Sequence, residues 1–180
     1  EEDIRHCVGC NLCLARLFRN DPMTCFINPV CAHDHQPEWL PTPTDDEKEV
    51  MIVGAGPAGM ECAWVAAKRG HEVTVYEALH ELGGVLVYGI PEFRLPRDIL
   101  DQEIGWIRKS GVRIKTDHRV ERADELFASG FDAVYVAIGT QLARAIPIEG
   151  IDLPIVLHGL DFLKAVNREK NPRLKSRVVV

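Results

Sequence analysis

The chain has 180 residues and a formal net charge of −6, from 21 basic and 27 acidic side chains, and 46% of its residues are hydrophobic. This composition is typical of a globular protein and excludes a disordered chain, which has few apolar residues. Because the charges are mixed and the balance is acidic, no basic surface for nucleic acid is expected. The apolar runs are far shorter than a bilayer span and no leader peptide is recognisable, so the sequence predicts a cytoplasmic protein without a membrane partner.

The two ends of the sequence lead us to expect a segment of a longer polypeptide. The chain begins at Glu1 instead of Met, and it stops on Val178-Val179-Val180, a run typical of the opening of a buried strand. Its length allows one domain of ordinary size and a small accessory piece. The expected partner is the remainder of the same polypeptide, and an oligomer is compatible with the sequence.

Four of the six cysteines gather near the start of the chain in the pattern C-x2-C-x2-C-x11-C, formed by Cys7, Cys10, Cys13 and Cys25. Thiolates separated by two residues can turn toward one centre, and a distant fourth thiolate completes the set. A disulfide framework fits poorly, because thiols this close rarely bridge well. Zinc also accepts four thiolates, but structural zinc sites usually pair two short cysteine knuckles. The spacing therefore favours a 4Fe-4S cluster over zinc, and both stay open.

Two cysteines fall outside this pattern, and a connector follows. Cys31 could replace Cys25 as a ligand, although a small buried thiol is the favoured interpretation, and Cys62 is expected in a helix core. Residues 37–48 contain three prolines and an acidic run, which predicts an extended linker. The predicted domains are therefore a cluster-binding segment over residues 1–36, this linker, and a nucleotide-binding domain over 49–175.

A dinucleotide-binding pattern begins after the linker. Glu49–Val53 is a predicted strand, Gly54-Ala55-Gly56-Pro57-Ala58-Gly59 is a glycine turn that opens a helix to about Arg69, and Glu72–Tyr76 is a second strand. In this pattern the first glycine permits the turn, the second lets a pyrophosphate approach the backbone, and the third lets the helix pack on the sheet. The helix N-terminus offers free N–H groups to the pyrophosphate.

Glu77 ends the second strand about twenty residues after the glycines, where an acid accepts hydrogen bonds from the hydroxyls of an adenosine ribose. A 2′-phosphate would be repelled there, which disfavours NADP at this site. The alternative interpretation is a surface acid at a strand end.

The rest of the chain continues the alternation of strands and helices. We predict a helix over Pro96–Lys109, a strand over Gly111–Lys115, a helix over Ala123–Ala128 and a strand over Asp132–Ile138. Repeated units of this kind predict an α/β fold: a Rossmann-like parallel sheet with helices on both faces, preceded by a small loop-and-helix segment.

Residues 1–36 resemble the iron–sulfur segment of the 2,4-dienoyl-CoA reductase and trimethylamine dehydrogenase family. The resemblance is carried by Arg5-His6-Cys7-Val8-Gly9-Cys10-Asn11-Leu12-Cys13 and by Cys25 before Asn28-Pro29. In that family the segment follows an FMN-binding TIM barrel and precedes a domain that binds FAD or ADP. The resemblance implies a 4Fe-4S cluster on Cys7, Cys10, Cys13 and Cys25, and an FMN barrel in the rest of the polypeptide.

Residues 49–180 resemble the FAD half of the glutamate synthase small subunit and the reductase module of dihydropyrimidine dehydrogenase. The resemblance is carried by Leu82–Leu86, Tyr88–Pro96 and Asp132–Thr140. It implies that FAD, or ADP in its place, is bound, and that residues 176–180 begin an NAD(P)H-binding domain. Together, the glycine pattern and this resemblance predict the following cofactor-binding residues: Gly54, Ala55, Gly56, Pro57, Ala58, Gly59, Glu77, Ala78, Gly84, Val85, Arg94, Val120, Ala137, Gly139 and Thr140.

Among these, Gly84, Val85 and Arg94 are implied at the flavin, Val120 at the adenosine end, and Ala137 to Thr140 at a second backbone contact. Arg94 can equally be a solvated loop arginine.

Two functions remain open at this point. The first is an electron-transfer segment of a multidomain oxidoreductase, which links FAD, reduced by NAD(P)H, to a 4Fe-4S cluster serving the FMN domain. No catalytic residue is predicted, and the segment alone is expected to be inactive. The second is a structural module that is stapled by zinc, holds ADP and has no redox activity.

Overall fold

The computed structural model describes residues 4–33, 35–142, 144, 146–168, 172, 174 and 177–179. A parallel sheet lies at its centre, with strands β1 (Glu49–Val53), β2 (Glu72–Tyr76), β3 (Arg113–Lys115) and β4 (Ala133–Val136) in the order β3-β2-β1-β4. Because the strands are parallel, all of their carboxyl ends lie at one edge of the sheet, where open α/β sheets bind ligands. The glycine turn and Glu77 follow two of these ends.

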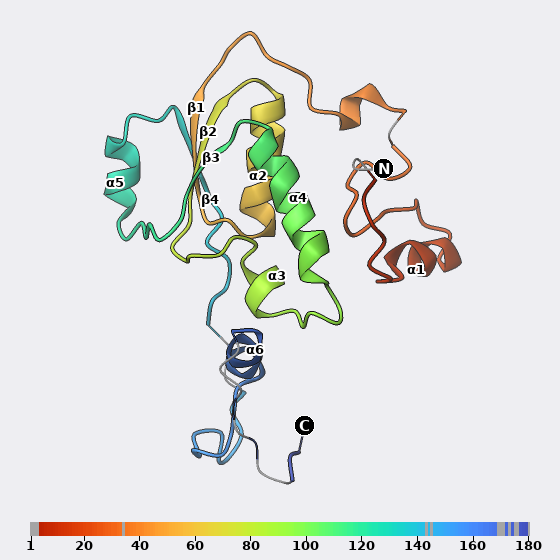
Figure 1. Cartoon of the computed structure of the whole chain (residues 1–180), viewed down its shortest axis with the longest axis vertical. Helices are drawn as coiled ribbons and strands as arrows, with labels where there is room; N and C mark the ends of the chain where they lie inside the picture. Colours follow the sequence, from red (N-terminus) through yellow and green to blue (C-terminus); the bar gives the residue numbers. More distant parts are fainter. Residues whose placement is uncertain are drawn as a thin grey trace.

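Helices cover the sheet, as the alternating pattern predicts. Helix α2 (Pro57–Lys68) packs on β1 and β2, and α4 (Arg97–Lys109) packs beside α2. Figure 1 shows both helices on one side of the strands and α5 (Ala123–Ala128) on the other side. The predicted Rossmann-like α/β fold is therefore confirmed.

The hydrophobic core lies between α2 and the two central strands. Ile52 and Val75 are fully buried on neighbouring strands, and Met60 of α2 packs in the same cluster. The buried face of α2 also carries Ala63 and Ala66, whose small side chains let the helix approach the sheet closely. The alanine-rich sequence of this helix thus serves its packing.

Four further elements complete the described structure: α1 (Leu12–Phe18), the 3-10 helix η1 (Pro37–Trp39), α3 (Val85–Tyr88) and α6 (Gly159–Asn167). The sequence patterns did not predict α3 or α6. In the described part of the chain, no helix combines the length and the apolar character that crossing a membrane requires. The predicted strands over Gly111–Lys115 and Asp132–Ile138 form, but both are shorter than expected.

The predicted linker contains η1 and is fastened at its far end. The Thr44 N–H donates to the Arg69 carbonyl at 2.9 Å, and the Lys48 carbonyl accepts from the Glu72 N–H at 2.9 Å. At its near end, the ring of Trp39 stacks on His33 with 4.0 Å between centroids. At the other end of the chain, Val178 and Val179 are not in a strand, and Val180 lies outside the described residues. The domain boundaries stay predictions.

Candidate functional site

The glycine turn between β1 and α2 is closely packed at two of its glycines. Gly54 has φ +103°, and a Cβ added there would lie 2.7 Å from the Ala137 carbonyl carbon at the end of β4. A Cβ on Gly59 would collide with the carbonyl oxygen of Gly54. The first and third glycines therefore let the turn, the helix and β4 meet, and they bring Ala137 to the site.

Gly56, the second glycine, borders open space. A Cβ at this position would meet nothing within 4 Å, whereas a Cβ on Gly84 would lie 2.9 Å from the Gly56 Cα. Gly56 is the N-cap residue of α2, Pro57 takes the first helical position, and no side chain caps the helix. The first-turn N–H groups of α2 therefore have no side-chain partner, and the open backbone beside them fits the pyrophosphate of a dinucleotide.

Glu77 is buried, with only 7% of its surface exposed, so the interpretation as a surface acid is wrong. Its Oε2 accepts a hydrogen bond from the Ala55 N–H at 2.7 Å, and its Oε1 accepts one from the Leu79 N–H at 2.8 Å. A carboxylate has about four acceptor positions, so both oxygens keep capacity for the ribose hydroxyls. Glu77 thus joins the end of β2 to the glycine turn and can still accept bonds from a ligand.

The loop that carries Gly84 is held in place from two helices. The Gly83 N–H donates to the Ala55 carbonyl at 2.8 Å, which joins the loop to the glycine turn. The Arg97 guanidinium donates to the carbonyls of Leu86 at 2.8 Å, Val87 at 2.6 Å and Ile90 at 3.2 Å. The Asn167 side-chain amide donates to the carbonyls of Tyr88 at 2.9 Å and Ile90 at 3.3 Å.

Sequence reasoning missed Arg97 and Asn167. No sequence pattern indicates the roles of these two residues, because their acceptors are backbone carbonyls, which every residue carries. Their role is to satisfy the carbonyls that end α3, a helix too short to be stable by itself.

We expect Arg97→Met to destabilise this loop, since the substitution removes a charged donor from three carbonyls. A hydrogen bond to a charged group contributes about 1.5–3 kcal/mol, so the free energy of unfolding should fall by roughly that amount. Arg97→Lys keeps the charge without the planar donor fork and should recover only part of the loss. Urea unfolding, with amide exchange over residues 85–91, measures both effects. Unchanged exchange in this loop would contradict the assigned role.

The other residues that are predicted to contact the flavin or the adenosine are more exposed to solvent than Glu77. The Val85 and Arg94 side chains are exposed, Val120 is half-buried in the loop after β3, and Gly139 and Thr140 are exposed beyond β4. The structure therefore brings the glycine turn together with Glu77, Gly84 and Ala137. The assignments of Arg94 and Val120 stay predictions.

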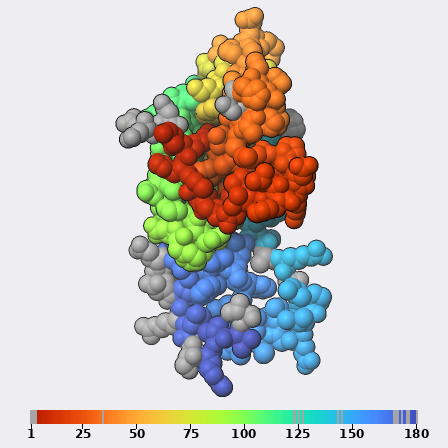
Figure 2. All heavy atoms as spheres, turned by 90° about the vertical axis from the view of Figure 1, so that its right-hand side faces the viewer, coloured from red at the N-terminus to blue at the C-terminus, as the bar shows by residue number. Residues whose placement is uncertain are grey.

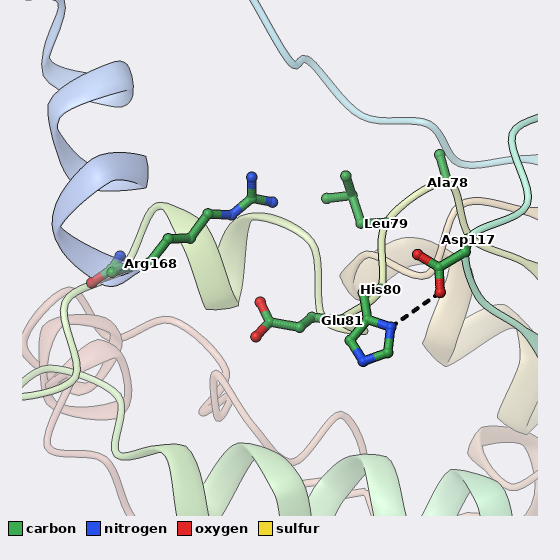
Figure 3. Close-up of a pocket in the computed structure, with 7 residues that line it drawn as sticks. Ala78, Leu79, His80, Glu81, Asp117 and Arg168 are labelled. Atoms are coloured by element: carbon green, nitrogen blue, oxygen red, sulfur yellow. Dashed lines mark hydrogen bonds and ion pairs between the residues drawn. The ribbon is translucent and has the colours of Figure 1, made fainter. Parts of the chain in front are cut away.

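A cavity of about 550 Å³ lies beside the segment that follows β2 (Figure 3). Ala78 lines it, as do His80 and Asp117, whose Nδ1 and Oδ2 atoms are 3.0 Å apart. The hydrogen bond to Asp117 and the charge of Asp117 raise the pKa of His80 above its usual value, so the imidazole keeps its proton to a higher pH than a free histidine would. The predicted cofactor residue Ala78 thus faces a polar cavity, but the glycine turn does not line it.

The cysteines of the N-terminal segment have free thiols and carry no disulfide. Gly9 and Asn11 turn the chain with φ +65° and +59°, and the Gly9 N–H points to the Cys7 Sγ at 3.4 Å. Within the described ranges, no three His, Cys, Asp or Glu side chains form a group that could hold a metal ion. Four thiols in one segment fit an iron–sulfur cluster by their chemistry, and the ligand set stays a prediction.

Cys62 lies on α2 and packs against the hydrophobic core, as predicted. Burial raises the pKa of its thiol, which disfavours the reactive thiolate.

A parallel sheet with a glycine turn, an open helix N-terminus and a buried acid at its carboxyl edge defines a dinucleotide-binding domain. Residues 48–180 match the family model described as pyridine nucleotide-disulphide oxidoreductase. The chain belongs to this family, and these residues form its FAD/NAD(P)-binding domain.

Relatives support this family. The chain is 40% identical to the NADP(+)-dependent formate dehydrogenase subunit beta of Moorella thermoacetica over 136 residues, 73% of this chain and 19% of the relative. It is 37% identical to the glutamate synthase [NADPH] small chain of Mycobacterium tuberculosis over 121 residues, 66% of this chain and 25% of the relative. The chain therefore spans about a fifth to a quarter of the length of these relatives.

A solved structure extends the similarity to most of the chain. The 2-naphthoyl-CoA reductase, in its complex with 2-naphthoyl-CoA, matches with a TM-score of 0.80 and 33% identity over 92% of this chain and 25% of its own. The predicted resemblance to the glutamate synthase small chain is confirmed over 121 residues, and the resemblance to the reductase module of dihydropyrimidine dehydrogenase stays a prediction. The assignment of residues 1–36 to the 2,4-dienoyl-CoA reductase branch stays a prediction.

Proposed function

We propose that this chain is the electron-transfer segment of a longer flavin and iron–sulfur oxidoreductase. The main support for the proposal is that two features occur in the same chain: four unbridged cysteines in the C-x2-C-x2-C-x11-C pattern, and a dinucleotide-binding turn that follows them. Two relatives support a nicotinamide nucleotide as redox partner, since their names include NADP(+) and NADPH. The proposed partners are an FMN domain and an NAD(P)H domain in the rest of the polypeptide.

The residues at the carboxyl edge of the sheet would bind FAD as follows. The first-turn N–H groups of α2 receive the pyrophosphate at Gly56, where a side chain is absent and the space is open. Glu77 accepts the ribose hydroxyls with its remaining acceptor positions. Arg97 and Asn167 hold the Gly84 to Ile90 loop against the site. When bound, the flavin supplies the conversion between two-electron and one-electron transfer.

Cys7, Cys10, Cys13 and Cys25 would hold a 4Fe-4S cluster, which supplies one-electron transfer. This segment needs no acid–base residue, because its task is to bind and orient the cofactors. Substrate chemistry would belong to the FMN domain.

The test is cofactor analysis of the full-length protein, purified without oxygen. We expect a brown protein with four irons for this segment and a heat-released nucleotide with the spectrum of FAD. Colourless protein with stoichiometric zinc and an adenine-only spectrum would contradict the proposal. That result would support the zinc-stapled module that holds ADP.

Two cysteine variants test the ligand set within the same protein. Cys25→Ala is expected to lose or convert the cluster, since it removes one of four thiolates. Cys31→Ala is the matched control, because this half-buried thiol lies six residues further along, outside the pattern. Iron analysis and the visible spectrum measure both variants. If Cys31→Ala loses iron and Cys25→Ala does not, the fourth ligand is Cys31.

A further inference from the structure

The N-terminal segment lies against helix α4 of the nucleotide-binding domain. Figure 1 shows residues of this segment beside α4, and Figure 2, viewed from that side, shows their red and orange atoms directly in front of the green atoms. The linker between the two parts is bonded to the nucleotide-binding domain at Thr44 and Lys48, and it stacks on the N-terminal segment at Trp39. The placement of the cysteines relative to the glycine turn therefore depends on contacts between this segment and α4.

Arg5 makes these contacts with one guanidinium group. Its Nη1 donates to the Ile27 carbonyl at 2.6 Å and lies 3.0 Å from Oε2 of Glu103 on α4. The same group stands over the Trp106 ring, with Cζ 5.6 Å from the ring centroid. Glu103 and Trp106 lie three residues apart and so share one face of the helix.

The position of Arg5 in the sequence makes this arrangement significant. Arg5 precedes Cys7 by two residues, and its acceptor Ile27 follows Cys25 by two residues. One side chain thus ties the loop with the first cysteine to the loop with the last, and ties both to α4. Loops separated by this length of chain lie together only when such long-range contacts hold them.

The ion pair between Arg5 and Glu103 is partly shielded from water. The Arg5 and Glu103 side chains are only 24% and 22% exposed, so water screens their attraction less than at an open surface. Burial is the main cause that raises the pKa of the Glu103 carboxyl above its usual value; the charge of Arg5 opposes this rise, and the charge of Glu61 on α2 adds to it. A planar guanidinium can pair with a carboxylate, donate to a carbonyl and stack on a ring together, which an ammonium cannot do.

We infer that Arg5 is a positioning residue that fixes the cysteine-bearing segment on α4 and thereby sets the placement of its thiols relative to the nucleotide-binding turn. The docking of this segment on α4 is supported by the contacts of Arg5 with Ile27, Glu103 and Trp106. Its consequence for electron transfer rests on the proposed function, because two redox centres exchange electrons efficiently only at a close and constant separation.

The test uses the full-length protein as isolated and measures amide hydrogen exchange by mass spectrometry. Arg5→Met should speed exchange several-fold in three separate stretches: residues 5–10, residues 25–28, and α4 around Glu103. Glu103→Gln should act on the same stretches. The double variant should add little to either single one, because both remove one shared interaction.

Arg16→Met is the matched control. Arg16 lies in the same segment, and its Nε donates to the Pro22 carbonyl at 2.6 Å, within the segment. This variant removes the same charge and a similar hydrogen bond, so its effect should stay within residues 16–22. Wild-type exchange in Arg5→Met, or an equal effect of Arg16→Met on α4, would overturn the inference.

A second measurement separates this inference from the proposed function. After rapid mixing with NADPH, Arg5→Met should bleach the flavin band at the wild-type rate and the broad cluster band several-fold more slowly. If both bands bleach at their wild-type rates although amide hydrogen exchange is altered, Arg5 docks the segment without controlling electron transfer. That result would overturn the part of the inference that concerns electron transfer. If the protein holds zinc, the proposed function fails, and hydrogen exchange still decides whether Arg5 docks the segment.

Discussion

Gly59→Ala is expected to lower the free energy of unfolding by about 3 kcal/mol, near the upper end of the usual cost of overpacking. The added methyl group would collide with the carbonyl oxygen of Gly54 and would lie 3.3 Å from the Cβ of Ala137. The oxygen belongs to the backbone, so it cannot rotate away as a side chain could. Helix α2 must then shift from the sheet or the glycine turn must open. Urea unfolding of the cofactor-free protein measures the loss.

Gly56→Ala is the matched control on the same turn. A Cβ here meets nothing within 4 Å, and the φ of −76° suits any residue, so stability should stay close to wild type. The methyl group would instead occupy the space in which a pyrophosphate approaches the backbone. We therefore expect a stable protein with strongly weakened FAD binding. Equal stability of the two variants would contradict the assigned packing role of Gly59.

Glu77→Ala should weaken both the fold and the binding of FAD. The substitution removes the acceptor of the buried Ala55 N–H and of the half-buried Leu79 N–H, and a buried polar group left without a partner costs about 1–3 kcal/mol. Losing the bonds to the ribose costs a further 1.5–3 kcal/mol of binding, roughly ten- to over a hundredfold in affinity. Unfolding without cofactor and FAD titration measure the two effects separately, since a bound ligand itself adds stability.

Glu72→Ala provides the comparison for Glu77. Glu72 begins the same strand and pairs with Arg113 at 2.9 Å, but both side chains are more than half exposed. Exposed ion pairs contribute about 0–1 kcal/mol, so this variant should change neither stability nor FAD affinity appreciably. If Glu77→Ala behaves like Glu72→Ala, the carboxylate holds neither the turn nor the ribose.

Local patterns predicted the central sheet and the turn well. The strand over Glu72–Tyr76 and the helix over Ala123–Ala128 form with the predicted bounds, and the glycine pattern identified Gly54, Gly56 and Gly59. These features depend on apolar runs, helix periodicity and the conformational range of glycine, all of which are read from neighbouring residues. Helix α3 was not predicted, because four residues are too few to show the periodicity of apolar residues that indicates a helix.

The sequence by itself determined the α/β class, the alternation of the four strands with α2, α4 and α5, the three glycines and the cysteine spacing, since each is a property of adjacent residues. Only the tertiary structure decided that Glu77 is buried against the Ala55 N–H, and that the end of β4 packs on Gly54. It also decided that Arg5 reaches Glu103 and that Arg97 holds three carbonyls of a neighbouring loop. These contacts join residues distant in the chain or use backbone acceptors common to all residues, so no local pattern marks them.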